Sequence, residues 1–211
     1  MLEHVPGWLG AALAGVRAGA EKLAIASVSA DVPALDLSSP AFANGGRLPP
    51  RFTADGEGVS PPLTWGRVPD GTASLALLVE DADSPTPQPI AHAVVWGIPP
   101  DAGRLAEGAI TADGEGSVDG DVGRNSYRRE GWLPPDPPTG HGEHRYAFQL
   151  FALAPGDDPG SSPNRAALLD AVAGRVLAVG LLTGVYARGE DAPASATGNL
   201  RASPLIAPAT T

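Results

Sequence analysis

Glycine and proline interrupt this chain so often that only short helices and strands can form between them. The chain has 27 Gly and 23 Pro in 211 residues. Glycine favours turns, and proline ends helices and central strands, so short elements joined by many turns are expected. Apolar residues make up 43% of the chain, which favours a folded protein over a disordered one.

Four apolar segments lie between the turn clusters and are typical of strands: Ser74–Glu80, His92–Ile98, His144–Leu153 and Val176–Tyr186. The first is almost continuously apolar, as expected for a strand that is covered on both faces. Many short strands with turns rich in Gly and Pro predict a mainly-β protein, either a sandwich or a barrel.

Helices are expected at two places. Residues 2–24 carry apolar side chains at a spacing of three to four, and this stripe would pack on its own domain or on a second subunit, as in a homodimer. The stripe consists of Val5, Leu9, Leu13, Val16, Ala20 and Leu23. The second helix is expected over Pro163–Ala173, with Ser162 as its N-cap.

Composition and charge exclude several classes of function. The chain has no Cys, which excludes disulfides, thiol catalysis and zinc sites built on thiolates. Its net charge of -10 disfavours nucleic acids and anionic membranes as partners. No apolar segment has the length of a transmembrane helix, and no basic residues precede the apolar N-terminal segment as in a secretory signal. We therefore expect a cytoplasmic protein.

Acidic and imidazole side chains lie at the ends of three expected strands. Asp81 and Asp83 directly follow the first strand, and alternate residues of an extended chain point to the same side. His92 opens the second strand and His144 opens the third. If these strands share a sheet, their ends converge on one pocket. Each motif also has a structural interpretation, since an isolated D-x-D often forms a turn and a His at a strand end is often only packed.

These motifs together resemble a known family. The sequence Asp81-x-Asp83-x-Pro85, the strand led by His92, and P-P-x-G-x-G-x-H-R-Y at 137–146 are similar to the signature regions of the phosphatidylethanolamine-binding proteins. The bacterial, Raf-kinase-inhibitor-like branch is the most similar. The resemblance implies a sandwich of two antiparallel sheets with a few peripheral helices, including the N-terminal one.

The resemblance also sets the expected domain organisation and pocket. An N-terminal helix and irregular extension (1–41) precede the sandwich domain (42–188), and a tail rich in Ala, Pro and Ser follows (189–211). The family has a small pocket for anions such as the phosphate of a phospholipid head group. By position, the pocket residues here are Asp81, Asp83, Pro85, His92 and His144.

The expected roles of these residues follow from their chemistry. The two His would supply N–H donors or positive charge, while the two Asp would orient an imidazole or hold a cationic part of the ligand. The resemblance also implies a cis peptide at Ser84–Pro85.

We expect a different role for each of three neighbouring residues. Asp136 is added to the binding residues, because its carboxylate would oppose a bare anion and favour an amine-bearing ligand. Arg145 is expected to be structural, paired with a carboxylate. His141, between two glycines, is expected to face solvent.

The function expected from these residues is binding of a small anionic or zwitterionic ligand, with modulation of a partner protein as one version of this hypothesis. No cofactor is expected, and an enzyme is disfavoured because no activated nucleophile is visible. Two alternatives use the same Asp and His side chains. One is a hydrolase with acid–base chemistry, and the other is a metal site.

Overall fold

The computed structural model describes residues 7–28, 31–112 and 120–188, so that the expected tail over 189–211 lies outside the described residues. The elements within these ranges are α1 (Gly7–Leu13), η2 (Ala20–Lys22), η3 (Ala24–Ser27), β1 (Leu37–Ser38), β2 (Gly46–Arg47), η4 (Pro50–Phe52), β3 (Leu63–Trp65), β4 (Ser74–Asp81), β5 (Ile90–Ile98), β6 (Arg104–Leu105), β7 (Asp121–Val122), β8 (His144–Leu153), α2 (Arg165–Val172) and β9 (Val176–Tyr186).

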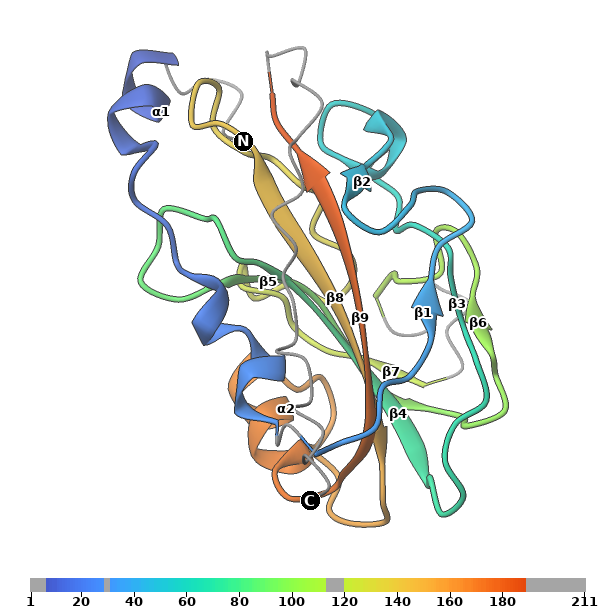
Figure 1. Ribbon diagram of the computed structural model, residues 1–211. Helices are drawn as coiled ribbons and strands as arrows, with labels where there is room; N and C mark the ends of the chain where they lie inside the picture. Colours follow the sequence, from blue (N-terminus) through green and yellow to red (C-terminus); the bar gives the residue numbers. More distant parts are fainter. Residues whose placement is uncertain (1–6, 29–30, 113–119, 189–211) are drawn as a thin grey trace, which may run out of the picture.

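The strands form two sheets, which confirms the mainly-β prediction (Figure 1). The large sheet has the order β2-β9-β8-β4-β5-β7, and the small sheet has the order β1-β3-β6. All pairings are antiparallel except that of β2 with β9, which is parallel. The expected sandwich of two sheets is confirmed, and its one parallel strand pair lies at this edge, because β2 joins β9 through a long connection rather than a hairpin.

The main core lies between the two sheets. Leu75, Leu77 and Val79 of β4 point into it and pack with residues of the small sheet such as Leu63 and Trp65. On neighbouring β8, every second residue from Tyr146 to Ala152 faces the same core. This period of two is the pleat of a strand, and it leaves the alternate residues for the opposite face of the large sheet.

The opposite face of the large sheet is also covered. Ala76 and Leu78 of β4 pack there with Leu168 and Val172 of α2. Because both faces are buried, β4 is apolar at consecutive positions instead of alternating with polar residues.

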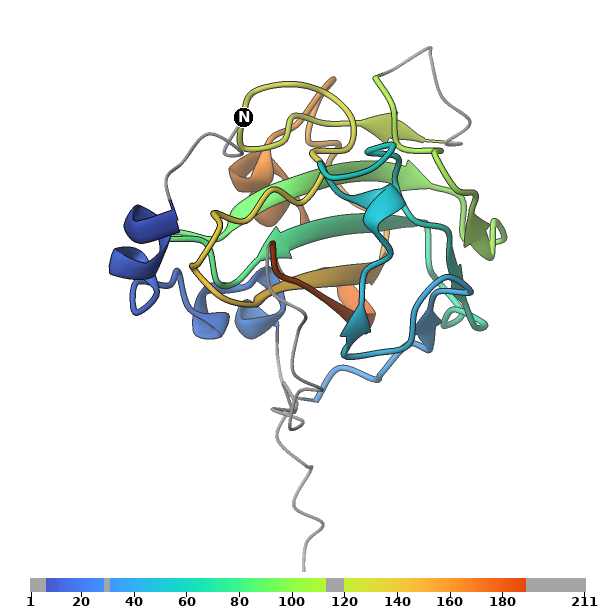
Figure 2. The same cartoon turned by 90° about the horizontal axis from the view of Figure 1, so that it is seen from above.

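The N-terminal arm, defined here as residues 7–28, lies on the same side of the large sheet as α2. In Figure 1 it runs from α1 at the upper left down to α2, and in Figure 2 it lies at the left, away from the small sheet. Leu23 and Ala24 are buried against the large sheet. The arm therefore packs on its own domain, and a homodimer stays a prediction.

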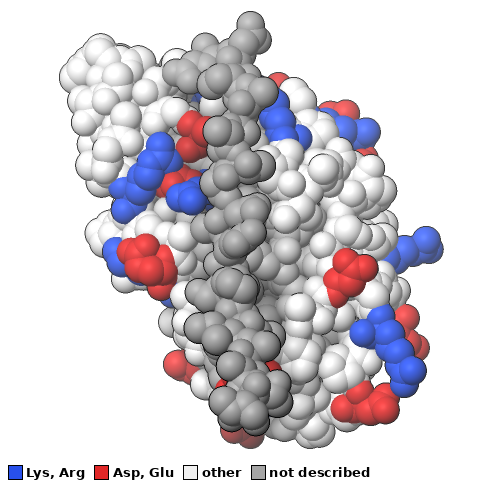
Figure 3. Space-filling view, in the orientation of Figure 1, with Lys and Arg blue, Asp and Glu red and all other residues white. Residues whose placement is uncertain are grey.

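The prediction of one helix over residues 2–24 is wrong. Within the described part of this segment, α1 ends at Leu13, and Leu9 and Val16 are 37% and 48% exposed. Gly19 has φ +103°, outside the helical region, and the many glycines lower the helix propensity of the whole segment. The uncharged α1 occupies a corner of the surface that is free of blue and red in Figure 3. Val5 of the expected stripe lies outside the described residues.

Two local expectations are also corrected. The helix expected over 163–173 spans Arg165–Val172, and its N-cap is Asn164 instead of Ser162, since the Asn164 side chain accepts a hydrogen bond from the Ala167 amide at 3.0 Å. The peptide bonds of the described residues, including Ser84–Pro85, are all trans. Among the described helices, none combines the length and apolar character needed to cross a membrane.

Glu80 joins the arm, α2 and the large sheet from a fully buried position. Its carboxylate accepts hydrogen bonds from the Ala24 amide at 2.8 Å, from Gln149 Nε2 at 2.7 Å and from Arg165 Nε at 2.5 Å. Gln149 in turn accepts from the Ile25 amide at 2.7 Å. A buried charge with this many donors stabilises the fold only while all its partners remain.

We predict that Glu80→Ala lowers the free energy of unfolding by about 3–5 kcal/mol, because it leaves Arg165 and buried amides without their acceptor. Urea denaturation followed by circular dichroism measures this change. The control is Asp70→Ala, which removes an exposed ion pair with Arg67 and is expected to cost less than about 1 kcal/mol. Equal effects of the two substitutions would contradict the assignment.

Candidate ligand-binding site

A cavity of about 290 Å³ opens where three strands of the large sheet meet. Asp81, at the end of β4, is paired with Ile90 of β5 and with Tyr146 of β8. The expected convergence of the strand ends is thus what the structure shows. The volume lies near the lower limit of typical small-molecule clefts, which is roughly 300 Å³.

Five of the six candidate binding residues line this cavity: Asp81, Pro85, His92, Asp136 and His144. The loop before β8 and the segment after β7 supply most of the remaining wall, with Asn125, Tyr127, Arg129, Glu130, Trp132, Leu133, Pro134, Pro137 and Pro138. Ala54, Ser84 and Ile90 complete it. Asp136, which belongs to the loop before β8, was expected from the sequence. The aromatic and other charged residues near it were not.

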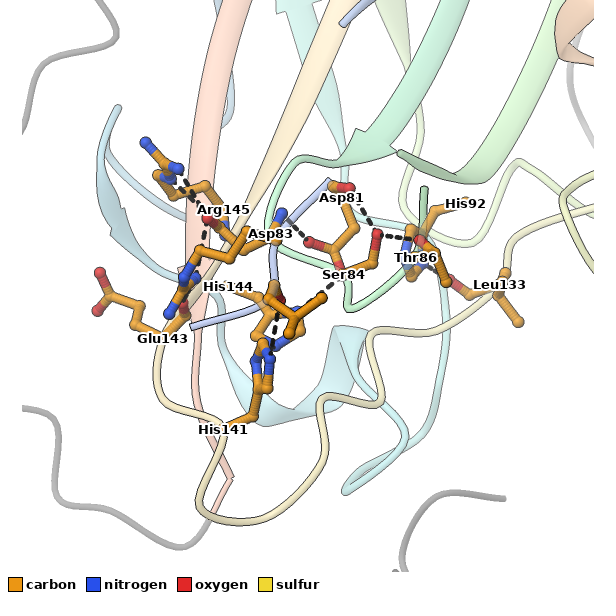
Figure 4. Close-up of polar contacts among 12 residues, drawn as sticks. Asp81, Asp83, Ser84, Thr86, His92, Leu133, His141, Glu143, His144 and Arg145 are labelled. Carbon is orange, nitrogen blue, oxygen red and sulfur yellow. Dashed lines mark hydrogen bonds and ion pairs between the residues drawn. The ribbon is translucent and has the colours of Figure 1, made fainter. Parts of the chain in front are cut away.

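Asp81 and His144 form a buried pair at the back of the cavity (Figure 4). His144 Nδ1 lies 2.8 Å from Asp81 Oδ2, and the two side chains are 1% and 6% exposed. A carboxylate can only accept, so His144 Nδ1 carries the hydrogen and donates it. Asp81 therefore orients an imidazole, which is one of the two roles expected for it.

His92 presents a free ring nitrogen at the cavity wall. Its Nδ1 lies 2.6 Å from the carbonyl oxygen of Leu133, so Nδ1 is the protonated nitrogen and donates. His92 Nε2 is buried and has no hydrogen-bond partner among the described residues. Burial lowers the pKa of His92, although the charge of Asp81 raises it. The ring is therefore neutral at pH 7, and Nε2 offers a lone pair.

Asp83 does not line the cavity, contrary to the prediction. Its carboxylate accepts hydrogen bonds from the Arg145 amide at 2.8 Å and from the Arg145 guanidinium at 2.7 Å. Arg17 of the N-terminal arm adds an ion pair at 2.8 Å. Burial raises the pKa of Asp83, but the hydrogen bonds and charges of Arg145 and Arg17 together lower it more, so the group stays ionised. The structural role expected for Arg145 is confirmed.

Asp83 points away from the cavity because of the turn that follows β4. The Asp83 amide donates to Asp81 Oδ1 at 2.8 Å, which closes a turn of the kind that an isolated D-x-D motif forms. The chain is thus not extended from Asp81 to Asp83, and the two carboxylates point to different partners (Figure 4). The argument from alternate residues on one side applies only within a strand.

His141 is 1% exposed, and the expectation that it faces solvent is wrong. Gly140 and Gly142 have φ of +81° and +94°, a left-handed conformation that turns the loop so that His141 points inward. His141 Nδ1 lies 2.7 Å from His144 Nε2, and His141 Nε2 lies 3.2 Å from the Val16 carbonyl oxygen. The flanking glycines were visible in the sequence, but their consequence for the side chain was not.

Both nitrogens of His144 are therefore engaged, one by Asp81 and one by His141. As a result, His144 can offer a ligand no N–H donor unless one of these bonds breaks. The prediction that both His supply N–H donors is therefore corrected. Among the nitrogens of His92 and His144, only Nε2 of His92 is available to a ligand, and in the neutral ring it accepts a hydrogen bond.

The charge of Asp136 is compensated by Arg188. The two side chains form an ion pair, and Arg188 also contacts Asp55 at 2.7 Å. The repulsion of an anion by Asp136 is therefore weaker than the sequence suggested. Arg188 was not singled out from the sequence, because it lies at the far end of the expected domain.

Two aromatic rings hold His92 in place. The Tyr146 ring meets it edge-on at 5.1 Å, and the Trp132 ring lies 6.2 Å away. The Tyr146 hydroxyl is buried without a hydrogen-bond partner among the described residues, and burial raises its pKa. The phenol is neutral, so it adds a polar but uncharged group beside His92.

The arrangement suits binding more than metal chemistry or hydrolysis. In the described part of the chain, no group of three or more His, Asp or Glu side chains is placed to hold a metal ion. His144 cannot activate a water through Nε2, because His141 occupies that atom.

Comparisons with known proteins agree with this fold. The sequence profile described as phosphatidylethanolamine-binding protein matches residues 38–187. A UPF0098 protein of Methanothermobacter thermautotrophicus is 40% identical over 159 residues, which is 74% of this chain and all of the relative. A Mycobacterium tuberculosis protein named as the lipoprotein LppC is 41% identical over 132 residues, which is 60% of this chain and 62% of the relative. Since this relative is named a lipoprotein, the cytoplasmic location stays a prediction.

A solved structure is also similar. YbcL of E. coli, described as a member of the mammalian PEBP family, has a TM-score of 0.68 and 30% sequence identity, covering 72% of this chain and 98% of YbcL. The profile match includes the second residue of β1 and all of the strands from β2 to β9. The chain therefore belongs to the phosphatidylethanolamine-binding protein family.

Proposed function

We propose that the cavity binds a small anionic or zwitterionic ligand of the phosphomonoester type, such as phosphoethanolamine, the free head group of a phospholipid. The observation that carries this proposal is the buried Nε2 of His92, which faces the cavity without a partner among the described residues. A buried polar atom of this kind is most stable when a ligand completes its hydrogen bond. Membership of a family named for phosphatidylethanolamine binding supports the same ligand class.

The protonation state of His92 narrows the chemistry of the ligand. Because Nδ1–H is used by Leu133, the neutral ring can only accept at Nε2. A ligand must therefore bring one hydrogen to this atom, as the P–OH of a monoanionic phosphomonoester does. A fully ionised phosphate binds only if His92 itself takes up a proton, so both routes place one proton between the ligand and the ring.

The charges around the cavity support a zwitterion over a bare anion. Asp81, Asp136 and Glu130 line it together with Arg129. Two of the carboxylates are already compensated, by His144 and Arg188. An ammonium group is tolerated in such mixed surroundings, whereas an isolated anion meets residual repulsion. The hydrolase alternative has less support, since both nitrogens of His144 are engaged.

We predict that His92→Asn weakens phosphoethanolamine binding at pH 6 about tenfold or more, the usual effect of losing a hydrogen bond to a charged group. Asparagine can still donate to the Leu133 carbonyl from the position of Nδ1, but it has no atom at the position of Nε2. Isothermal titration calorimetry measures the change. The control is Arg67→Ala, at an exposed position outside the cavity lining. Unchanged affinity in His92→Asn would remove the proposal.

We also predict a pH dependence. The second pKa of a phosphomonoester is about 6, and burial holds the pKa of His92 below its ordinary value. Above pH 6, neither the ligand nor His92 holds the bridging proton in its free form. The dissociation constant therefore increases about tenfold per pH unit above about pH 6. Titrations at several pH values between 5.5 and 8 test this. A constant affinity across that interval would contradict the bridging proton.

A further inference from the structure

Three hydrogen bonds in series connect the N-terminal arm with the back of the cavity (Figure 4). They run from the Val16 carbonyl oxygen to His141 Nε2 at 3.2 Å, from His141 Nδ1 to His144 Nε2 at 2.7 Å, and from His144 Nδ1 to Asp81 Oδ2 at 2.8 Å. Both ends of this series are oxygen atoms that only accept. Each end therefore needs an N–H from the imidazole next to it.

The count of protons follows from this geometry. His141 Nε2 must carry a hydrogen for Val16, His144 Nδ1 must carry one for Asp81, and the bond between the two rings needs a third. Two neutral imidazoles hold only two hydrogens. A neutral pair would leave the lone pair of His141 Nε2 against the Val16 carbonyl oxygen. All three bonds exist together only when the pair of rings carries one additional proton.

We propose that His141 and His144 share a single additional proton, and that this protonated pair fastens the N-terminal arm to two loops that border the cavity. These are the turn after β4 (82–85) and the loop before β8 (137–143). His141 then acts as a positioning residue, which sets the protonation of His144 and ties it to Val16. The proposal concerns the arm and does not depend on which ligand the cavity binds.

The charges that face the pair place the additional proton on His144. Asp81 lies directly against it, and Asp83 and Glu143 belong to the adjoining turn and loop (Figure 4). His141 instead feels the positive charge of Arg17, and burial together with the charges of His144 and Arg17 lowers the pKa of His141. Other titratable groups around the pair are His92, Arg145 and Tyr146.

The arm makes several further contacts with the same two loops. Ala18 and Gly19 donate their amides to the carbonyl oxygens of Ser84 and Ala82, both at 2.9 Å. Arg17 binds Asp83 and the Glu143 carbonyl oxygen. A Cβ at Gly10 would lie 2.1 Å from the Thr139 carbonyl oxygen, so the close packing of α1 on that loop leaves no room for a side chain at this position. Loss of the shared proton removes one bond from this set and loosens it.

The protonation itself is measurable in the unmodified protein. Long-range ¹H–¹⁵N NMR spectra of the imidazoles distinguish their protonated nitrogens. At pH 6 we expect His144 with both nitrogens protonated and His141 with hydrogen on Nε2 alone, because this is the state in which all three hydrogen bonds exist together. Two neutral rings at pH 6, with the hydrogen of His141 on Nδ1, would overturn the proposal.

Hydrogen exchange tests the link to the arm. After correction for intrinsic rates, the protection of the Ala18 and Gly19 amides is expected to fall about two- to tenfold as the pH rises through the titration of the pair. The Leu35 amide, which donates to the Val179 carbonyl oxygen and makes no contact with the His pair, serves as the internal control. Its protection is expected to stay constant, and an equal change there would count against the proposal.

Two substitutions separate the two bonds of His141. Asparagine keeps an acceptor at the position of Nδ1 but cannot reach Val16, so His141→Asn should lower the protection of the Ala18 and Gly19 amides at all pH values. Glutamine places a donor at the position of Nε2, so His141→Gln should retain their protection and abolish its pH dependence. An undiminished pH dependence in His141→Gln would overturn the proposal. If neither variant folds, the NMR spectra of the unmodified protein still decide.

Discussion

Three carboxylates are buried within four residues at the end of the central strand, and the need to compensate each of them organises much of the structure. Glu80 requires α2 and the amides of the arm, Asp81 requires His144, and Asp83 requires Arg145 and Arg17. Burying an ionised group without a partner would cost several kcal/mol, so none of these contacts is optional. Segments far apart in the sequence are thereby held at one end of β4, which is where the cavity forms.

This compensation also determines what remains for a ligand. Asp83 is used entirely for structure, and His144 has no free nitrogen. His92 differs because its outer nitrogen faces the cavity while its inner nitrogen is fixed by a backbone carbonyl. A frame of paired charges beside a His92 nitrogen without a partner among the described residues suits the ligand site that we propose, because little would have to move when the ligand enters.

The sequence predicted those features that depend on local patterns. The four main strands follow from apolar segments between turns, and the meeting of Asp81, His92 and His144 follows from their places at strand ends. Prediction failed where side-chain direction depends on a turn or on a distant contact. Asp83 turns away through its hydrogen bond to Asp81, and His141 turns inward through two glycines of positive φ. The arm departs from a helix because its stability comes from the sheet it packs on, which its own periodicity cannot reveal.

The position of the arm has a consequence for how the protein is made on the ribosome. Residues 24 and 25 are synthesised before their side-chain partners at positions 80 and 149, and before Arg165, which completes the same network. Likewise β2 pairs with β9, more than a hundred positions later. The arm and β2 therefore reach their final places only after the last strands have emerged, and such long-range contacts form slowly.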